Sequence, residues 1–222
     1  MTNQKIFALF FLIWYSGHFF RNYLLHLSDI LGLFADLVIC LILPLVFMRM
    51  LYLDHRSLFL KISSDVRWSG IGIFVSFLLG ITSAYILYMT GYWSANYFHY
   101  DFHIQDNLIL LAIKQYGVFG VFYLAFTAGI FEELLFKSVL IRCFNKEPSK
   151  FIFVASSVVL FGALHYWHGP LAALIIAMLY GLPTSIYYYY KRNILNLIVV
   201  HSVGDLLTFI WVWGWMDKGL VH

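Results

Sequence analysis

Long apolar segments with few charges alternate with short polar segments along the chain. Because a membrane-spanning helix needs about 20 mostly apolar residues, this pattern predicts about seven spans joined by short loops. The expected spans are 6–20, 30–51, 68–93, 117–144, 151–166, 170–190 and 194–215. Residues 104–116 mix aliphatic residues with Asp106 and Lys114, which predicts a short interfacial helix or an extension of the next span. The expected fold is an all-α polytopic transmembrane helical bundle forming one membrane-embedded domain over residues 1–222, with N-terminal spans over 6–93.

The composition agrees with a membrane protein and excludes several other classes. Of the 222 residues, 62% are hydrophobic and 11% are charged, which leaves no room for a soluble domain. No small-residue cleavage site follows the first apolar run, so we expect a retained first helix. No basic and aromatic cluster resembles a nucleic-acid site, so nucleic acid is not an expected partner. Cys40 and Cys143 lie in or beside predicted spans and suggest neither a disulfide framework nor a thiolate metal site.

The distribution of basic residues predicts the orientation in the membrane. Loops rich in lysine and arginine face the cytoplasm, and three segments on one side of the expected bundle carry these residues: Arg49, Arg56, Lys61 and Arg67; Arg142, Lys146 and Lys150; Lys191 and Arg192. Residues 96–106 lack both residue types, and Trp211, Trp213 and Trp215 suit an outer aromatic belt. We expect a multi-pass protein of the cell membrane with a cytoplasmic N-terminus and an external C-terminus. The short loops suggest a prokaryotic protein.

Two adjacent glutamates, Glu132 and Glu133, interrupt the apolar run 117–141. A carboxylate at the bilayer centre costs about 2.5 to 3.5 kcal/mol on insertion scales, so this pair needs partners or a polar cavity. Successive helical residues point about 100° apart, and Glu133 stacks with Lys137 one turn later. Glu132 is then expected to face another helix, where a histidine could hold it ionised or share its proton.

Two later spans supply such histidines. His165 follows Phe161 by four residues, and His201 precedes Asp205 by four residues, so each histidine has a companion on its own helix. Carboxylate and imidazole groups in a dry site can activate water as general base and acid, which is hydrolase chemistry. Asp36 is interpreted as structural. The remaining histidines are interpreted as interfacial or loop side chains: His18, His26, His55, His99, His103, His168 and His222.

Other functions remain open on the residues alone. The Glu133 and Lys137 pair is explained as a structural ion pair, whereas Glu132 has Phe136 at the fourth following position and is better explained by a cavity role. A non-catalytic membrane protein, such as a bacteriocin-immunity or scaffold factor, could use the same groups to hold its helices together. A proton-coupled carrier could use them as a proton path.

Three ordered motifs, taken together, resemble a known family. They are Glu132-Glu133-Leu-Leu-Phe-Lys137, Phe161-Gly-Ala-Leu-His165 and His201-Ser-Val-Gly-Asp205, each in its own apolar segment. The core 117–215 that carries them resembles the CAAX-protease and bacteriocin-processing family of intramembrane proteases, which are type II CAAX prenyl endopeptidase-like and usually described as glutamic peptidases. The resemblance implies that Glu132 and His165 activate a water, that Glu133 orients or pairs with the cation, and that His201 with Asp205 stabilises the oxyanion. Lys137 and Phe161 would support the site.

Two positions depart from the family pattern. Lys137 replaces the usual arginine and keeps the charge but loses the planar fork that holds a carboxylate in two hydrogen bonds. Asp205 stands where the family shows asparagine or aspartate, and an aspartate donates to an oxyanion only when it is protonated. An ionised Asp205 would instead orient His201 or help to bind a metal.

The resemblance ranks metal-independent water activation first, so no cofactor is expected. Two histidines and a glutamate are also a catalytic zinc set, which keeps zinc as the alternative. The expected partners are the lipid bilayer and a membrane-associated peptide or protein substrate. Family members suggest prenylated C-termini, bacteriocin or signalling-peptide precursors and sorting-tagged proteins. A prokaryotic origin would make the prenylated class the less favoured one.

Overall fold

The computed structural model describes residues 63–98, 117–144, 146–165 and 171–217, with single positions and short pieces between residues 8 and 60. These residues are helical and contain no strand, so the all-α expectation is confirmed for this part of the chain. The chain divides into two compact units. Unit 1 comprises Met1–Trp68 and Phe131–Leu197, and unit 2 comprises Ser69–Ile130 and Ile198–His222.

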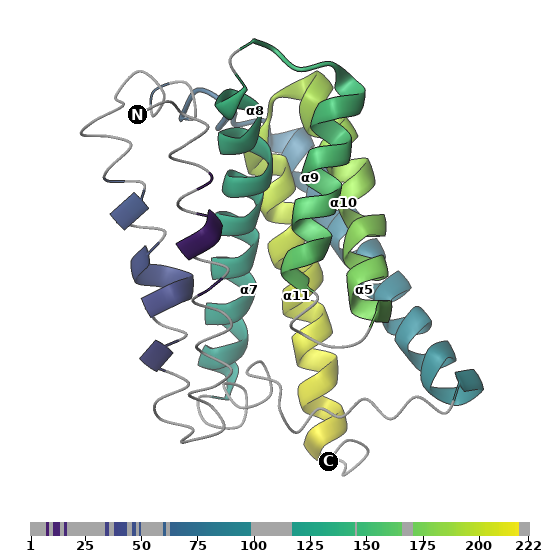
Figure 1. Ribbon diagram of the computed structural model, residues 1–222. Coiled ribbons are helices and arrows are strands. Elements are labelled where there is room, and N and C mark those ends of the chain that lie inside the picture. Colours follow the sequence, from purple (N-terminus) through teal and green to yellow (C-terminus); the bar gives the residue numbers. More distant parts are fainter. Residues whose placement is uncertain are drawn as a thin grey trace. The chain divides into compact units, whose positions relative to one another are not determined.

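The helices of Figure 1 follow the predicted apolar segments closely. They are η1 (Val38–Ile42), α5 (Gly70–Phe98), α7 (Val118–Glu133), η3 (Leu134–Val139), α8 (Leu140–Cys143), α9 (Lys150–His165), α10 (Leu171–Lys191) and α11 (Ile194–Asp217). The predicted span 117–144 is one helical run, α7–η3–α8, whose central part η3 is π-helical.

About seven spans were expected, and within the described residues three helices have the length and hydropathy to cross a membrane. They are Gly70–Leu87, Val118–Cys143 and Ile194–Trp211. Helix α9 has 16 residues and is shorter than a full span, and α10 is not among the three. The expected spans 6–20 and 30–51 lie largely outside the described residues, and the interfacial segment 104–116 lies wholly outside them. So do Asp36 and the seven histidines interpreted as interfacial or loop residues.

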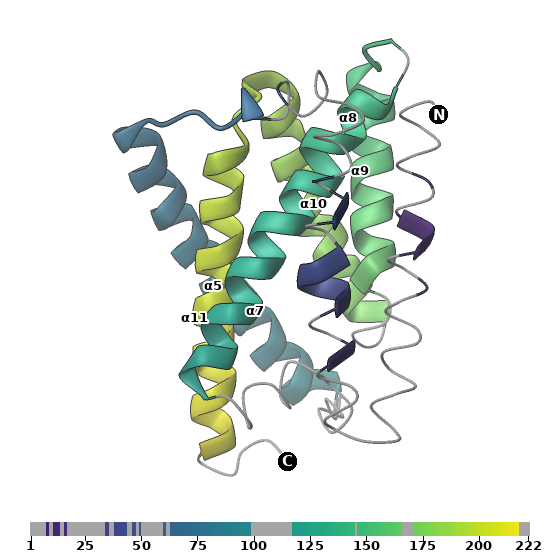
Figure 2. The same cartoon turned by 90° about the vertical axis from the view of Figure 1, so that its left-hand side faces the viewer.

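Unit 1 is built on the pairing of α9 with α10, which Figures 1 and 2 show side by side. Gly162 of α9 permits this close approach, because a Cβ at this position would collide with the Met178 side chain of α10. Helix η3 also contacts α9. Phe136 of η3 and Phe161 of α9 are both almost fully buried and meet edge to face, with their ring centroids 5.6 Å apart.

In unit 2, close helix contacts are made at small residues, as is common between membrane helices. A Cβ at Gly80 of α5 would lie 2.8 Å from Cβ of Val203 in α11, and one at Gly204 of α11 would lie 2.9 Å from Oγ of Ser83. The outward face of α5 carries exposed apolar side chains such as Ile71, which is 81% exposed. An apolar exposed face of this kind is what a helix presents to lipid.

The structure corrects the placement of Arg142 in a cytoplasmic loop. Arg142 lies inside α8, at the end of the 26-residue apolar run Val118–Cys143, and its side chain is 14% exposed. The helix ends only at Phe144, where the backbone becomes extended. The charge is tolerated there because Asp65 pairs with it, with the arginine Nη2 2.6 Å from the carboxylate Oδ2. Counting basic residues cannot separate a buried, paired arginine from a loop arginine.

Candidate active site

The two glutamates stand at the end of α7, immediately before the π-helical turn η3. Within η3 the Leu140 N–H donates to the carbonyl of Leu135, five residues earlier, and to that of Lys137, three residues earlier. The carbonyl of Phe136, which a regular α-helix would pair with Leu140, accepts a hydrogen bond from Ser157 Oγ of α9 at 2.9 Å. Such turns arise as bulges within α-helices and occur frequently at functional sites. This bulge ties the glutamate-bearing helix to α9.

Glu132 faces His165 at the end of α9. The carboxylate Oε2 lies 4.0 Å from His165 Nε2, and the two side chains are 13% and 25% exposed. On its other side, His165 Nδ1 lies 2.9 Å from the carbonyl oxygen of Phe161. Because a carbonyl only accepts, Nδ1 carries the hydrogen and donates. In the neutral ring Nε2 therefore directs a lone pair toward Glu132.

Glu133 and Lys137 are fully buried in unit 1. The Lys137 ammonium interacts electrostatically with Glu133 and less strongly with Glu132. It donates to Ser157 Oγ at 3.1 Å and lies 5.0 Å from the centroid of the Phe161 ring. Buried charges are stable only when they are paired and hydrogen-bonded, and this lysine has a hydroxyl, an aromatic face and two carboxylates within its surroundings.

Phe161 joins the two halves of this cluster. Its carbonyl orients His165, its ring lies under the Lys137 ammonium, and the ring centroid is 4.7 Å from that of the His165 imidazole. The side chain itself is 1% exposed. One residue of α9 thus contacts both the histidine and the lysine, which fits the spacing of four residues between Phe161 and His165.

The third motif lies in unit 2, on α11. His201 Nε2 is 3.3 Å from Asp205 Oδ2, one helical turn later, and the side chains are 6% and 24% exposed. Ser202, the next residue, is buried against Gly129 of α7, where a Cβ would come within 2.9 Å of the Ser202 backbone nitrogen. This close approach fixes the segment of α11 that carries His201.

The structure brings five of the predicted site residues together within unit 1 and pairs the other two within unit 2. The first group is Glu132, Glu133, Lys137, Phe161 and His165, and the second is His201 and Asp205. Across the described ranges, no group of three or more His, Cys, Asp or Glu residues is arranged to hold a metal ion. A catalytic zinc takes three protein ligands, whereas Glu132 and His165 form a group of only two.

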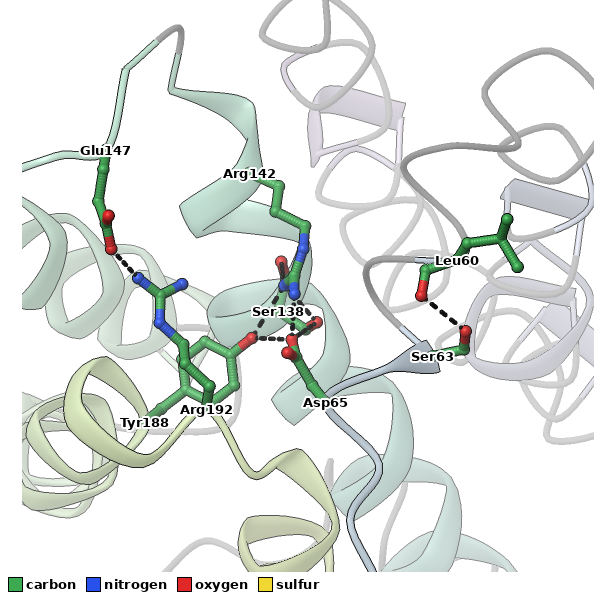
Figure 3. A network of polar contacts seen from close by, with 8 residues as sticks. All are labelled: Leu60, Ser63, Asp65, Ser138, Arg142, Glu147, Tyr188 and Arg192. Atoms are coloured by element: carbon green, nitrogen blue, oxygen red, sulfur yellow. Dashed lines mark hydrogen bonds and ion pairs between the residues drawn. The ribbon is translucent and has the colours of Figure 1, made fainter.

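Sequence reasoning missed a second polar cluster in unit 1, drawn in Figure 3. Asp65 Oδ2 accepts from Ser138 Oγ at 2.8 Å and from the Tyr188 hydroxyl, besides its ion pair with Arg142. Arg142 Nη1 also donates to Ser138 Oγ at 2.9 Å and to the Tyr188 hydroxyl at 3.0 Å. Asp65, Tyr188 and the residues of α8 and η3 are far apart in the chain and share no motif, so the sequence pattern does not predict their contact.

Sequence reasoning also missed two serines beside Lys137. Ser157 of α9 and Ser185 of α10 are fully buried, and their hydroxyl oxygens lie 2.9 Å apart. The available signal was the presence of hydroxyl side chains in otherwise apolar helices, where they need a partner.

Comparison with known families gives one match. Residues 114–207, less than half of the chain, match the model of the Rce1-like family, described as type II CAAX prenyl endopeptidase Rce1-like. The matched segment contains all three motifs. No curated protein and no solved structure gives a significant match.

Proposed function

From the match of residues 114–207 to the Rce1-like family, we propose that this chain is a membrane-embedded endopeptidase. It hydrolyses a peptide bond in a membrane-associated peptide or protein, using a water activated by Glu132 and His165. The observation that carries this proposal is the 4.0 Å separation between Glu132 Oε2 and His165 Nε2, with the imidazole oriented by Phe161.

That separation suits a shared water better than a direct hydrogen bond. Polar atoms more than about 3.5 Å apart are commonly bridged by water. If a water oxygen lies about 2.8 Å from each of these two atoms, which are 4.0 Å apart, the angle Oε2–water–Nε2 is roughly 90°. This value is near the angle between the two O–H bonds of water. Both hydrogens would then be held by acceptors, one on the carboxylate and one on Nε2. The oxygen lone pairs would point away from both, toward a substrate carbonyl.

The reaction follows from this arrangement. One acceptor takes a proton as the water oxygen bonds to the carbonyl carbon, giving a tetrahedral intermediate with a negative oxygen. The C–N bond then breaks, and the proton is returned to the leaving nitrogen, which departs as an amine. General acid and base action of this kind contributes about 10²- to 10⁴-fold to the rate.

Glu133 and Lys137 hold the charge of the site in place in this proposal. The Lys137 cation attracts both carboxylates, and in this proposal Glu132 acts in its ionised form, which can accept a proton. His201 is assigned to the oxyanion on the resemblance to the family. Asp205 accepts in its 3.3 Å pair with His201 and orients the imidazole, which requires no protonated aspartate.

Zinc is the second candidate for water activation. Glu132 and His165 would hold it, and a bound zinc would lower the pKa of a coordinated water and polarise the carbonyl. The family description names a prenyl endopeptidase. A prokaryotic origin would disfavour a prenylated substrate and leave bacteriocin or signalling-peptide precursors and sorting-tagged proteins. We assign the protein to the cell membrane with a cytoplasmic N-terminus and an external C-terminus.

The test is cleavage of a membrane-anchored peptide library by the purified, detergent-solubilised protein, with and without a chelator. Glu132→Gln should lower cleavage by about 10²- to 10⁴-fold, and wild-type cleavage should survive the chelator. The matched control is Glu147→Gln, because Glu147 is 71% exposed and lies in the loop before α9. It should cleave at the wild-type rate.

Each departure from this pattern has a defined meaning. Full activity of Glu132→Gln sinks the assignment of Glu132. Loss of activity in chelator that zinc restores moves the protein to the metalloproteases. A proton-coupled carrier would instead show transport that depends on Glu132 and on a pH gradient.

A further inference from the structure

Lys137 occupies the position where the family has arginine, and the structure shows what surrounds the shorter cation. Its ammonium is fully buried and donates to Ser157 Oγ at 3.1 Å. An ammonium is a compact point charge on a flexible stem, whereas a guanidinium is a rigid fork that orients itself on a carboxylate. A lysine at this position therefore needs an additional fixed acceptor to hold one geometry.

Ser157 is built to be that acceptor. Its single hydroxyl hydrogen donates to the Phe136 carbonyl at 2.9 Å, which leaves both lone pairs free to accept. One lone pair accepts from Lys137 and the other from Ser185 Oγ at 2.9 Å. The Ser157 hydroxyl thus has three partners on two helical segments, Phe136 and Lys137 of η3 and Ser185 of α10.

Ser185 fixes the orientation from the other side. It is fully buried on α10, and its one hydroxyl hydrogen is shared between two acceptors, Ser157 Oγ at 2.9 Å and the Gly181 carbonyl at 2.6 Å. Neither serine hydroxyl can rotate away without leaving a buried polar group unsatisfied, which is costly. The two serines therefore provide a fixed hydrogen-bond acceptor, Ser157 Oγ, for the Lys137 ammonium.

We propose that Ser157, supported by Ser185, is a positioning residue that fixes the Lys137 ammonium within the cluster that contains Glu133 and Glu132 and acts on these carboxylates through that cation. The inference rests on the proposed peptidase function. It predicts that Ser157 acts on catalysis through Lys137 and not on its own.

The test is a double-mutant cycle on cleavage, using Ser157→Ala, Lys137→Met and the combined variant. Loss of a hydrogen bond to a buried charge predicts a fall of about 10- to 100-fold in kcat/KM for Ser157→Ala, carried by kcat. In the Lys137→Met background the same change should have almost no further effect. Adding Lys137→Arg to Ser157→Ala should restore most of the lost activity, because a planar guanidinium orients on a carboxylate without a hydrogen bond from Ser157.

The matched control is Thr184→Val. Thr184 is buried beside Ser185, and its hydroxyl donates to the Tyr180 and Gly181 carbonyls of its own helix, both at 3.0 Å. This variant removes a buried hydroxyl from the same region and should keep kcat. Equal losses in Thr184→Val and Ser157→Ala, or additive losses in the cycle, overturn the proposal.

A second measurement separates this inference from the proposed function. The same cycle is run on thermal unfolding in detergent, which reports whether Ser157 and Lys137 interact whatever the reaction is. Coupling in unfolding together with a fully active Glu132→Gln keeps the Ser157 and Lys137 contact and removes the peptidase assignment. Absence of coupling in unfolding, with Glu132→Gln inactive, removes the positioning role alone.

Discussion

Asp65 and Arg142 form a buried ion pair that joins the segment before α5 to α8, with 2.6 Å between the guanidinium Nη2 and the carboxylate Oδ2. The backbone reinforces it, because the Asp65 carbonyl accepts from the Ile194 N–H at 2.9 Å. Next to it, Asn193 Nδ2 donates to the Arg67 carbonyl at 3.2 Å. The segment around Asp65 is thereby fixed to the turn between α10 and α11.

Removing the Asp65 charge should destabilise the protein strongly. Asp65→Asn leaves the Arg142 guanidinium buried without its counter-ion, and breaking a buried pair costs about 3–5 kcal/mol. Partial exposure of Arg142 places the expected loss near the lower end. The measurement is thermal or denaturant unfolding of the purified variant in detergent.

The control for this prediction is the ion pair of Arg192 with Glu147. Its atoms are 2.5 Å apart, but Glu147 is 71% exposed. Glu147→Gln should change the unfolding free energy by about 0–1 kcal/mol, because solvent screens exposed pairs. If Asp65→Asn unfolds like Glu147→Gln, the Asp65 pair is no stronger than a surface contact.

The hydroxyls of neighbouring tyrosines on α10 should differ in their effect on stability. The Tyr188 hydroxyl donates to Asp65 and accepts from Arg142, in a side chain that is fully buried. Tyr188→Phe should cost about 1–3 kcal/mol, because it leaves charged partners one hydrogen bond short. The exposed Tyr190 hydroxyl accepts from Lys150 at 3.1 Å, and Tyr190→Phe should lower the unfolding free energy by only a few tenths of a kcal/mol. Equal melting temperatures for the two variants would contradict this ranking.

Gly129 should not tolerate a methyl group. A Cβ there would lie 2.9 Å from the Ser202 backbone nitrogen and 3.1 Å from its Cα, so the backbone of α7 or α11 would have to move. Overpacking of this kind costs about 1–3 kcal/mol, and Gly129→Ala should lower the melting temperature. Gly70→Ala is the control, since a Cβ at Gly70 meets nothing within 4 Å. A stable Gly129→Ala would mean that the two helices can separate at little cost.

Hydropathy predicted the helices well because an apolar run of helical length has few alternatives in a membrane. The run 117–144 and the helix Val118–Cys143 agree to one residue at each end. The expected pairing of Glu133 with Lys137 assumed a regular helix, whereas η3 widens the turn between them. That bulge depends on Ser157 of another helix, whose hydroxyl donates a hydrogen bond to the Phe136 carbonyl. The local sequence therefore cannot specify the bulge.

The candidate site divides in the same way. The order and spacing of the motifs selected five residues of unit 1, including Glu132 and His165, and a pair in unit 2, His201 and Asp205. Ser157 and Ser185 beside Lys137, and the separate Asp65 cluster, come from segments that only folding brings together. Single polar residues in apolar helices carry no partner information, and the choice among possible partners is made by packing.

The π-helical turn also changes the direction in which side chains after it point, relative to those before it. One inserted residue rotates everything after it by about 100° relative to what precedes it. The glutamates before the turn are aimed at the His165 side of unit 1, and Arg142 after it is aimed at Asp65. Deleting a single residue within η3 would put the two ends out of phase, so that restoring one set of contacts would forfeit the other. The bulge thus lets one helix present Glu132 to His165 near its middle and Arg142 to Asp65 at its end.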